Sequence, residues 1–248
     1  AVAQCLLAGK SSEVRKLIIT ASGGPFLGKS RKQLEKVSVE DALAHPTWKM
    51  GPLVTINSAT LVNKGLEVIE AHLLFDVPFA DIEVTVHPQS VVHSMVEFID
   101  GSTIAQASPP DMRIPMAWGL SAGREIFRVP EAAPACDWKT ASTWAFEPLD
   151  EEVFPAVGLA RVAGEAGGTA PAVFNAANEA AVAGFLAGEI TFMSIVDHIE
   201  HVLHLHLAGS GDLGPGSSFV SGNALTLEDV LAADGWAREF SLGGSLAS

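Results

Sequence analysis

The sequence predicts an α+β fold, in which a small, mostly antiparallel sheet with helices is followed by a C-terminal four-helix bundle. Three observations predict it. Short β-branched stretches alternate with helical periodicity up to about residue 122. Asp100-Gly101 separates two of these stretches, which is a strong hairpin signal. From Leu149 onward only helical periodicity remains, so sheet and helices are separated along the chain, as in α+β folds.

In the first half, apolar and β-branched runs predict the strands, and we expect the last three to be adjacent and antiparallel. The strand Val14–Thr20 should end in the turn Ser22–Pro25. Ser38–Asp41 resembles a capping box that opens a short helix. The predicted strands are Val14–Thr20, Pro52–Ile56, Asp81–Val86, Val92–Ile99 and Ser102–Ala107.

A helix is predicted after the strand Pro52–Ile56, with Ser58 at its favoured N-cap position. Six apolar residues then recur at helical spacing and should face a core. They are Leu61, Val62, Leu66, Ile69, Leu73 and Leu74.

The second half predicts the bundle, and Pro171 suits a first helical turn. Weak periodicity and two prolines make 123–147 a connecting segment, so the predicted division is 1–122, 123–147, 148–240 and a flexible tail at 241–248. The four predicted helices are Val153–Glu165, Pro171–Ala187, Thr191–Leu205 and Leu225–Glu239.

Composition limits the function. The formal net charge of −14 argues against nucleic acid or an anionic membrane surface as partner. No apolar run reaches the roughly 18 residues that span a bilayer, and the first residues do not resemble a signal peptide. Cys5 and Cys136 give no disulfide framework, so we expect a cytoplasmic protein.

The start of the predicted helix carries the strongest functional signal. Asn63 and Lys64 lie four and three residues before Glu67, so the three can share one helix face. A helix start favours phosphate, to which Lys64 adds charge and Ser58 and Asn63 add hydrogen bonds. Glu67 could hold Mg²⁺ or Mn²⁺, which prefer oxygen ligands. In the structural alternative, Lys64 and Glu67 form a solvated ion pair and Ser58 is only a cap.

A polar loop at residues 45–51 precedes this helix and offers an imidazole, an indole and a thioether from His45, Trp48 and Met50. Trp48 could belong to a core, but Pro46 and Gly51 frame it in a loop, where a buried aromatic is less expected. The grouping suggests a site for a small phosphorylated substrate beside a divalent cation.

Weaker signals favour structural roles. His198, His201, His204 and His206 could form a zinc or nickel site, but no cysteine or paired carboxylate completes a tetrahedral set, which favours a partly exposed helix face. Structural roles are also expected for His87 and His93, which flank a predicted turn, and for Asn175, Asn178 and Glu179 on a helix.

Several stretches together resemble the 1-deoxy-D-xylulose 5-phosphate reductoisomerase family, which acts in non-mevalonate isoprenoid biosynthesis. They occur in one order over nearly the whole chain, and several are unusual in composition. The matching stretches are Thr20–Phe26, His45–Gly51, Ser58–Glu67, Val86–Met95, Pro110–Arg113 and Asn175–Glu179.

The resemblance implies an NADPH-dependent enzyme that converts 1-deoxy-D-xylulose 5-phosphate to 2-C-methyl-D-erythritol 4-phosphate with Mg²⁺, Mn²⁺ or Co²⁺, and a homodimer. By resemblance, the phosphate-binding positions are Ser22, Ser58, Asn63 and Lys64, and Glu67 is the third metal carboxylate. His45, Trp48 and Met50 match the loop that covers the substrate, and Gly51 matches a backbone position near the nicotinamide.

Family members begin with an NADPH-binding Rossmann domain and an Asp-Ser-Glu stretch, whereas Ala1–Gln4 resembles the segment just after that stretch and no GxGxxG is present. We therefore expect the catalytic and C-terminal portions of the enzyme, inactive alone. The alternative is a non-catalytic module that binds a sugar phosphate or assembles with a partner. A metal-dependent phosphatase or aldolase is a weaker hypothesis, since carboxylates are few.

Overall fold

The computed structural model describes residues 1–44, 50–121, 128–209 and 213–243. The chain forms two compact units, which we describe separately. The first unit comprises Ala1–Ser22 and Ala80–Leu149, and the second comprises Gly23–Phe79 and Asp150–Ser248. The functional division at residues 122 and 147 stays a prediction.

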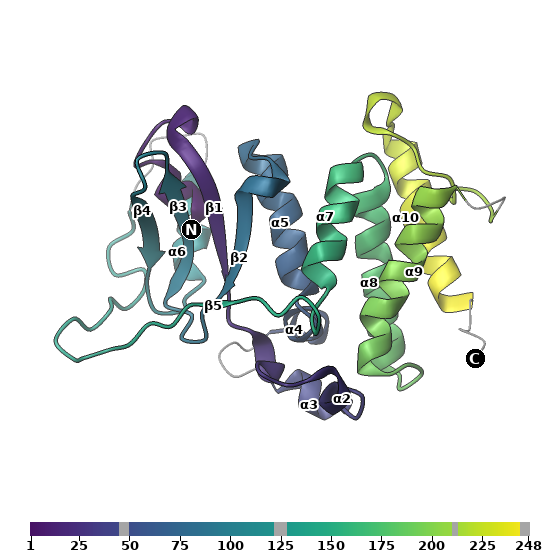
Figure 1. The fold of residues 1–248 in the computed structure, drawn as a ribbon, viewed down its shortest axis with the longest axis horizontal. Helices are drawn as coiled ribbons and strands as arrows, with labels where there is room; N and C mark the ends of the chain where they lie inside the picture. The colour runs from purple at the N-terminus through teal and green to yellow at the C-terminus, as the bar shows by residue number, and fades with distance from the viewer. Residues whose placement is uncertain (45–49, 122–127, 210–212, 244–248) are drawn as a thin grey trace. The chain divides into compact units, whose positions relative to one another are not determined.

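The first unit contains a five-stranded sheet of order β4-β3-β1-β2-β5 (Figure 1). The β1–β3, β3–β4 and β2–β5 pairs are antiparallel and only β1–β2 is parallel, which confirms a mostly antiparallel sheet. The strands are β1 (Val14–Ala21), β2 (Ile82–Val86), β3 (Val92–Phe98), β4 (Thr103–Ala107) and β5 (Glu147–Pro148).

The predicted adjacency of the last three long strands is wrong for β2, because β1 lies between β2 and β3. Leu17 at the middle of β1 is fully buried and pairs with Ile82 on one side and Val96 on the other, so β1 is a central strand. The roughly sixty residues between β1 and β2 give the long connection that a parallel pair requires.

Two α-helices complete this unit in the described residues, α1 (Val2–Leu6) and α6 (Arg113–Ser121), with a short 3₁₀ turn, η1 (Ser11–Glu13). Sequence reasoning missed α6. Pro115 suggests a break there, but it lies in the first helical turn, where a missing N–H costs little.

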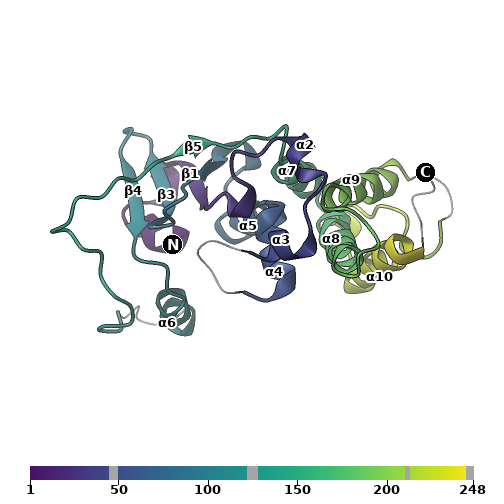
Figure 2. The ribbon, with the colours of Figure 1, turned by 90° about the horizontal axis from the view of Figure 1, so that it is seen from below.

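The second unit is helical, and its last four α-helices confirm the predicted bundle. Helix α8 packs against α7, α9 and α10 (Figures 1 and 2), which explains why its apolar residues surround it and why Val173, Phe174 and Ala177 are buried. The helices are α2 (Arg31–Leu34), α3 (Val39–Leu43), α4 (Pro52–Ala59), α5 (Val62–Phe75), α7 (Ala156–Ala166), α8 (Ala170–Leu186), α9 (Phe192–Ala208) and α10 (Leu227–Gly243), with 3₁₀ turns η2 (Gly24–Phe26) and η4 (Gly222–Ala224). A further 3₁₀ turn, η3 (Phe79–Asp81), begins with the last residue of one segment of this unit and continues into the first unit.

The predicted helix starts are confirmed at three places. Ser38 and Asp41 form the expected capping box, with Asp41 N–H donating to Ser38 Oγ at 3.1 Å. Pro171 lies in the first turn of α8, and the Thr191 hydroxyl accepts from Ser194 N–H at the start of α9.

The predicted strand Pro52–Ile56 is wrong, because these residues begin helix α4. Pro52 at the first helical position has a φ suited to a helix and lacks only an N–H that would have no partner. Thr55 accommodates its β-branch by donating Oγ1–H to Gly51 O at 2.9 Å. A short apolar run cannot distinguish a strand from a buried helix by periodicity alone.

The predicted N-cap role of Ser58 is consequently wrong as well, since Ser58 lies in the last turn of α4. The N-cap of α5 is Leu61, which turns the chain with a left-handed φ of 61° and no side-chain cap. Leu61, Val62 and Ile69 are buried as expected, but Leu73 and Leu74 are 71% and 73% exposed.

Phe79 explains why Leu73 and Leu74, at the end of α5, are exposed. Its ring stacks on His72 at 4.3 Å, so the packing partner lies on the His72 side of the last turn and the two leucines point away. Both cysteines are free, and none of the described helices is long and apolar enough to span a bilayer.

Candidate functional site

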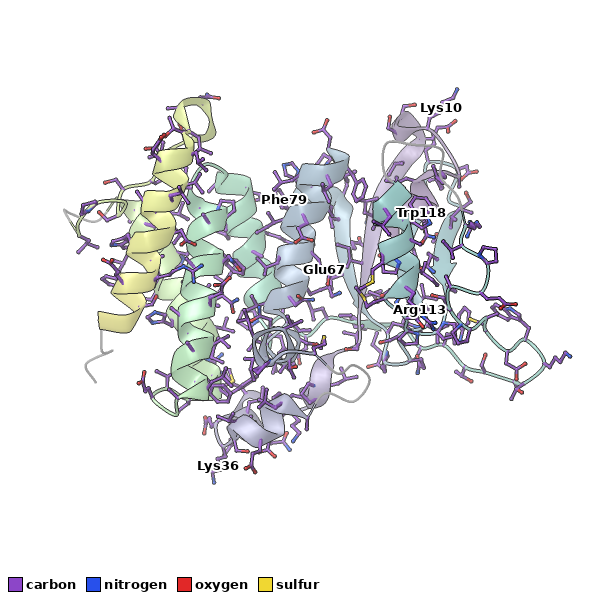
Figure 3. The ribbon with its side chains drawn as sticks, turned by 180° about the vertical axis from the view of Figure 1, so that it is seen from behind. Lys10, Lys36, Glu67, Phe79, Arg113 and Trp118 are labelled. Carbon is purple, nitrogen blue, oxygen red and sulfur yellow. The ribbon has the colours of Figure 1, made fainter. Side chains whose placement is uncertain are left out.

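The first two turns of α5 bring three predicted site residues together. Asn63 Nδ2 donates to one carboxylate oxygen of Glu67 at 2.8 Å, and Lys64 Nζ donates to the other at 2.8 Å. The one-face prediction for these residues is confirmed, and Figure 3 shows Glu67 on α5. The carboxylate thus has a defined place between an amide and an ammonium group.

The exposure of this group differs from that of a fully solvated ion pair. The Lys64 side chain is only 14% exposed, whereas that of Glu67 is 36% exposed. A cation with so little contact with water gains from a nearby anion, because few water dipoles compete with it. The cluster therefore offers an ammonium group and an amide to an anion, and carboxylate oxygens to a hard cation.

Glu70 adds a second carboxylate one turn beyond Glu67. Partial desolvation raises the pKa of Glu70, and the charge of Glu67 raises it further. A carboxylate three residues away on the same helix disfavours the charged form of its neighbour. Sequence reasoning missed Glu70, which the spacing from Glu67 could have indicated.

Ser58 precedes this cluster in the chain and belongs to the preceding helix. It lies in the last turn of α4, and the chain turns sharply at Leu61 before Asn63. Gly24 packs against the same turn, because a methyl group at Gly24 would lie 2.9 Å from Ser58 O. The side-chain oxygen of Asn57 beside it is buried without a hydrogen-bond partner among the described residues.

The remaining predicted residues belong to other parts of the sequence. Gly51 is the N-cap of α4, exposed and with open space above its Cα, and the partly exposed Met50 precedes it. His45 and Trp48 lie outside the described residues. Ser22 follows the last residue of β1 and belongs to the other unit.

The histidines of the sheet have structural partners. Fully buried His87 donates from Nδ1 to Ala145 O at 2.8 Å and accepts at Nε2 from Val91 N–H at 3.1 Å. His93 Nε2 lies 3.0 Å from Ser108 O. Both contacts agree with the structural interpretation of these side chains.

The bundle histidines form no metal cluster in the part of the chain that the structure describes, where no three His, Cys, Asp or Glu residues could share an ion. His206 is fully buried, with Nε2 2.7 Å from Thr169 Oγ1 and Nδ1 3.0 Å from Ser217 O. A carbonyl can only accept, so Nδ1 carries the proton and Thr169 donates to Nε2.

Glu179 also has a structural partner. It accepts from Asn175 Nδ2 at 3.0 Å and from Arg238 Nη1 at 2.7 Å, while Arg238 also pairs with Asp234. The network links α8 to α10, which agrees with the structural role expected of Asn175 and Glu179. Asn178 is fully buried, and neither polar atom of its side chain has a partner among the described residues.

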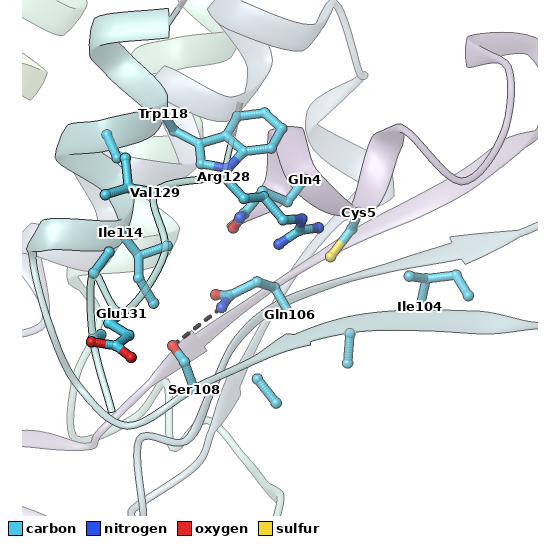
Figure 4. A pocket seen from close by; sticks show the side chains of 15 residues that line it. Gln4, Cys5, Ile104, Gln106, Ser108, Ile114, Trp118, Arg128, Val129 and Glu131 are labelled. Atoms are coloured by element: carbon cyan, nitrogen blue, oxygen red, sulfur yellow. Dashed lines mark hydrogen bonds between the residues drawn. The ribbon is translucent and has the colours of Figure 1, made fainter. Parts of the chain in front are cut away.

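A hollow of about 480 Å³ in the first unit contains none of the predicted site residues. The residues that line it include Gln4, Gln106, Ser108, Trp118, Arg128 and Glu131 (Figure 4). Its size therefore does not mark it as the site that the motifs predict.

Two family descriptions match the chain. Residues 107–240, more than half of it, match the DXP reductoisomerase C-terminal domain. Residues 1–75 match the 1-deoxy-D-xylulose 5-phosphate reductoisomerase C-terminal domain. The chain belongs to the 1-deoxy-D-xylulose 5-phosphate reductoisomerase family.

Curated relatives named 1-deoxy-D-xylulose 5-phosphate reductoisomerase include those of Kitasatospora griseola and Arthrobacter sp. (strain FB24). They are 63% and 62% identical over 238 residues, covering 96% of this chain but 58% and 56% of their own lengths. The chain thus spans little more than half the length of these reductoisomerases.

Solved structures of the family share its fold. The reductoisomerase from Zymomonas mobilis in complex with NADPH is 41% identical, with a TM-score of 0.83 over 97% of this chain and 58% of its own. A DOX-P reductoisomerase in complex with NADPH, fosmidomycin and magnesium is 37% identical, with a TM-score of 0.84 over 98% of this chain and 60% of its own. The predicted resemblance to reductoisomerases is confirmed.

Proposed function

We propose that this chain carries the substrate- and cation-binding part of an enzyme that converts 1-deoxy-D-xylulose 5-phosphate to 2-C-methyl-D-erythritol 4-phosphate with NADPH. One observation supports this most strongly: Asn63 and the nearly buried Lys64 both hold the half-exposed carboxylate of Glu67. A phosphorylated, oxygen-rich substrate needs both the positive donors and the cation that this group suits.

In this proposal, four residues bind the substrate phosphate: Ser22, Ser58, Asn63 and Lys64. His45, Trp48 and Met50 cover the substrate and exclude water, and the backbone of Gly51 lies near the nicotinamide. Its open N-cap position is compatible with close approach of a ring.

A divalent cation fits Glu67 by donor chemistry, since Mg²⁺, Mn²⁺ and Co²⁺ all accept carboxylate oxygen. The described residues hold no group of three suitable side chains, so further ligands would come from outside them. When bound, the cation supplies Lewis-acid stabilisation of negative charge on the substrate oxygens. Glu67 would orient it beside the phosphate donors.

Turnover by the complete protein tests the proposal. With 1-deoxy-D-xylulose 5-phosphate and Mg²⁺, NADPH absorbance should fall, whereas residues 1–248 alone should leave NADPH unchanged. Robust turnover by residues 1–248 alone would contradict the expectation that the dinucleotide is held elsewhere. No NADPH oxidation by the complete protein would contradict the function.

We also propose that the complete protein is a cytoplasmic homodimer associating through the first unit. Strand β4 is an edge strand, and Ile99, Met116, Leu120 and Trp138 of this unit are exposed. Open strand edges and exposed large apolar side chains favour association. Light scattering should give twice the protomer mass, and Leu120→Glu should shift it toward the monomer.

A further inference from the structure

Helix α5 has a second unusual feature on the face opposite its polar residues, where Gly65 lies. With about 100° between successive residues, Asn63, Lys64 and Glu67 occupy a sector of about 100°, and Gly65 lies about 150° from the middle of that sector. Gly65 is buried, as are Val68 and Ile69 on the same side. The polar face and the packed face of the helix thus begin with adjacent residues.

Helix α7 approaches Gly65 too closely for a side chain. A methyl group at Gly65 would lie 2.7 Å from Ala160 Cβ and 3.1 Å from the carbonyl oxygen of Ala156. Neither atom can swing away, since one is a Cβ and the other belongs to the backbone. Ala156 and Ala160 are themselves fully buried. Any larger residue at position 65 must therefore separate the two helices.

Helix α7 is also packed on other sides, so it has little room to retreat from a methyl group at Gly65. Val157 and Ala163 of α7 are fully buried, and α7 also packs against α8. Arg161 of α7 donates to Phe79 O, and the Phe79 ring lies against Gly164, where a methyl group would meet it at 2.2 Å. The far end of α5 is fixed to the same place, because His72 stacks on Phe79.

We propose that Gly65 is a positioning residue: it lets α7 press on the back of α5 and so sets where Asn63, Lys64 and Glu67 stand. The inference rests on the proposed function for its kinetic consequence. Binding groups displaced by about 1 Å can lower catalysis roughly 100-fold, so a shift of α5 should affect the reaction directly.

The test compares four forms of the complete protein: wild type, Gly65→Ala, Ala160→Gly and the double variant Gly65→Ala/Ala160→Gly. We expect Gly65→Ala to raise the Mg²⁺ concentration needed for half-maximal rate and to lower kcat/KM about 10–100-fold. The double variant moves one methyl group from α7 to α5, so it should recover most of both. Gly158→Ala is the matched control, because a methyl group at this position of α7 meets nothing within 4 Å, and it should keep wild-type Mg²⁺ dependence.

Wild-type Mg²⁺ dependence and kcat/KM in folded Gly65→Ala would overturn the proposal. If Gly65→Ala does not fold, Ala160→Gly decides. The space left by the lost methyl group next to α5 should change the Mg²⁺ dependence, and an unchanged dependence overturns the proposal.

If the wild type has no reductoisomerase activity, the proposed function fails, but crystal structures of residues 1–248 still test the positioning. A wider spacing between α5 and α7 in Gly65→Ala supports the proposed positioning. Where only Ala160→Gly folds, a changed spacing in that variant supports it. An unchanged spacing overturns the proposal.

Discussion

Two polar clusters of the helical unit differ in how completely their groups are satisfied. His206 is fully buried, uses both ring nitrogens, and stacks on Trp236 at a centroid distance of 5.6 Å. Glu67 keeps 36% of its side chain exposed and, among the residues that the structure describes, accepts hydrogen bonds from Asn63 and Lys64 of its own helix. A buried imidazole with both ring nitrogens hydrogen-bonded serves stability, whereas a half-open cluster of opposite charges retains capacity for a ligand.

The comparison predicts the largest effect on activity at Glu67. In the complete protein, Glu67→Gln should lower kcat/KM by more than about 100-fold, because losing even an outer-shell partner of a metal costs about 10–100-fold. The free energy of unfolding should change by less than about 1 kcal/mol, since the carboxylate is partly exposed. Near-normal turnover at ordinary Mg²⁺ concentration would exclude Glu67 as a ligand.

The reverse pattern is expected at His206. His206→Ala should lower the free energy of unfolding by about 2–4 kcal/mol, because it opens a cavity beside Trp236 and leaves Thr169 and the Ser217 carbonyl without their partner. Urea denaturation measures this, with exposed His204→Ala as control at less than about 0.5 kcal/mol. Equal effects of the two variants would show that the buried cluster is not a stability centre.

Acid should weaken the buried cluster more than the open one. Burial lowers the pKa of His206 below its usual 6.5, although the bond to Ser217 partly opposes this, and burial and then His201 lower the pKa of His198. Below pH 6.5 the unfolded histidines take up protons that the folded ones do not. Stability is therefore full above pH 6.5 and falls as the pH drops toward the folded pKa values, by up to about 1.4 kcal/mol per pH unit for each group.

Urea denaturation at pH 7, 6 and 5 tests this slope. His206→Gln should lose part of it, and His204→Ala should keep it. A wild-type slope in His206→Gln would assign the acid sensitivity to other groups.

Local features of this molecule could be predicted from its sequence, whereas features that depend on distant segments could not. Spacing alone placed Asn63, Lys64 and Glu67 on one face, because i,i+3 and i,i+4 geometry is local. It failed at Pro52–Ile56, where an apolar run suits a strand or a buried helix equally. The central place of β1 and the contact of Gly65 with Ala160 depend on segments far apart in the chain, which no local pattern encodes.

The smallest expected effect concerns Leu73, in the last turn of α5. Leu73 continues the apolar spacing of Ile69 but is 71% exposed, because Phe79 packs on the neighbouring His72. Leu73→Gln should therefore change the free energy of unfolding by less than about 0.5 kcal/mol, as is usual for surface sites. Ile69→Ala, one turn earlier and buried, is the matched comparison and should cost about 2–5 kcal/mol. If Leu73→Gln instead costs as much as Ile69→Ala in urea denaturation, the periodic pattern was right and Leu73 is covered in solution.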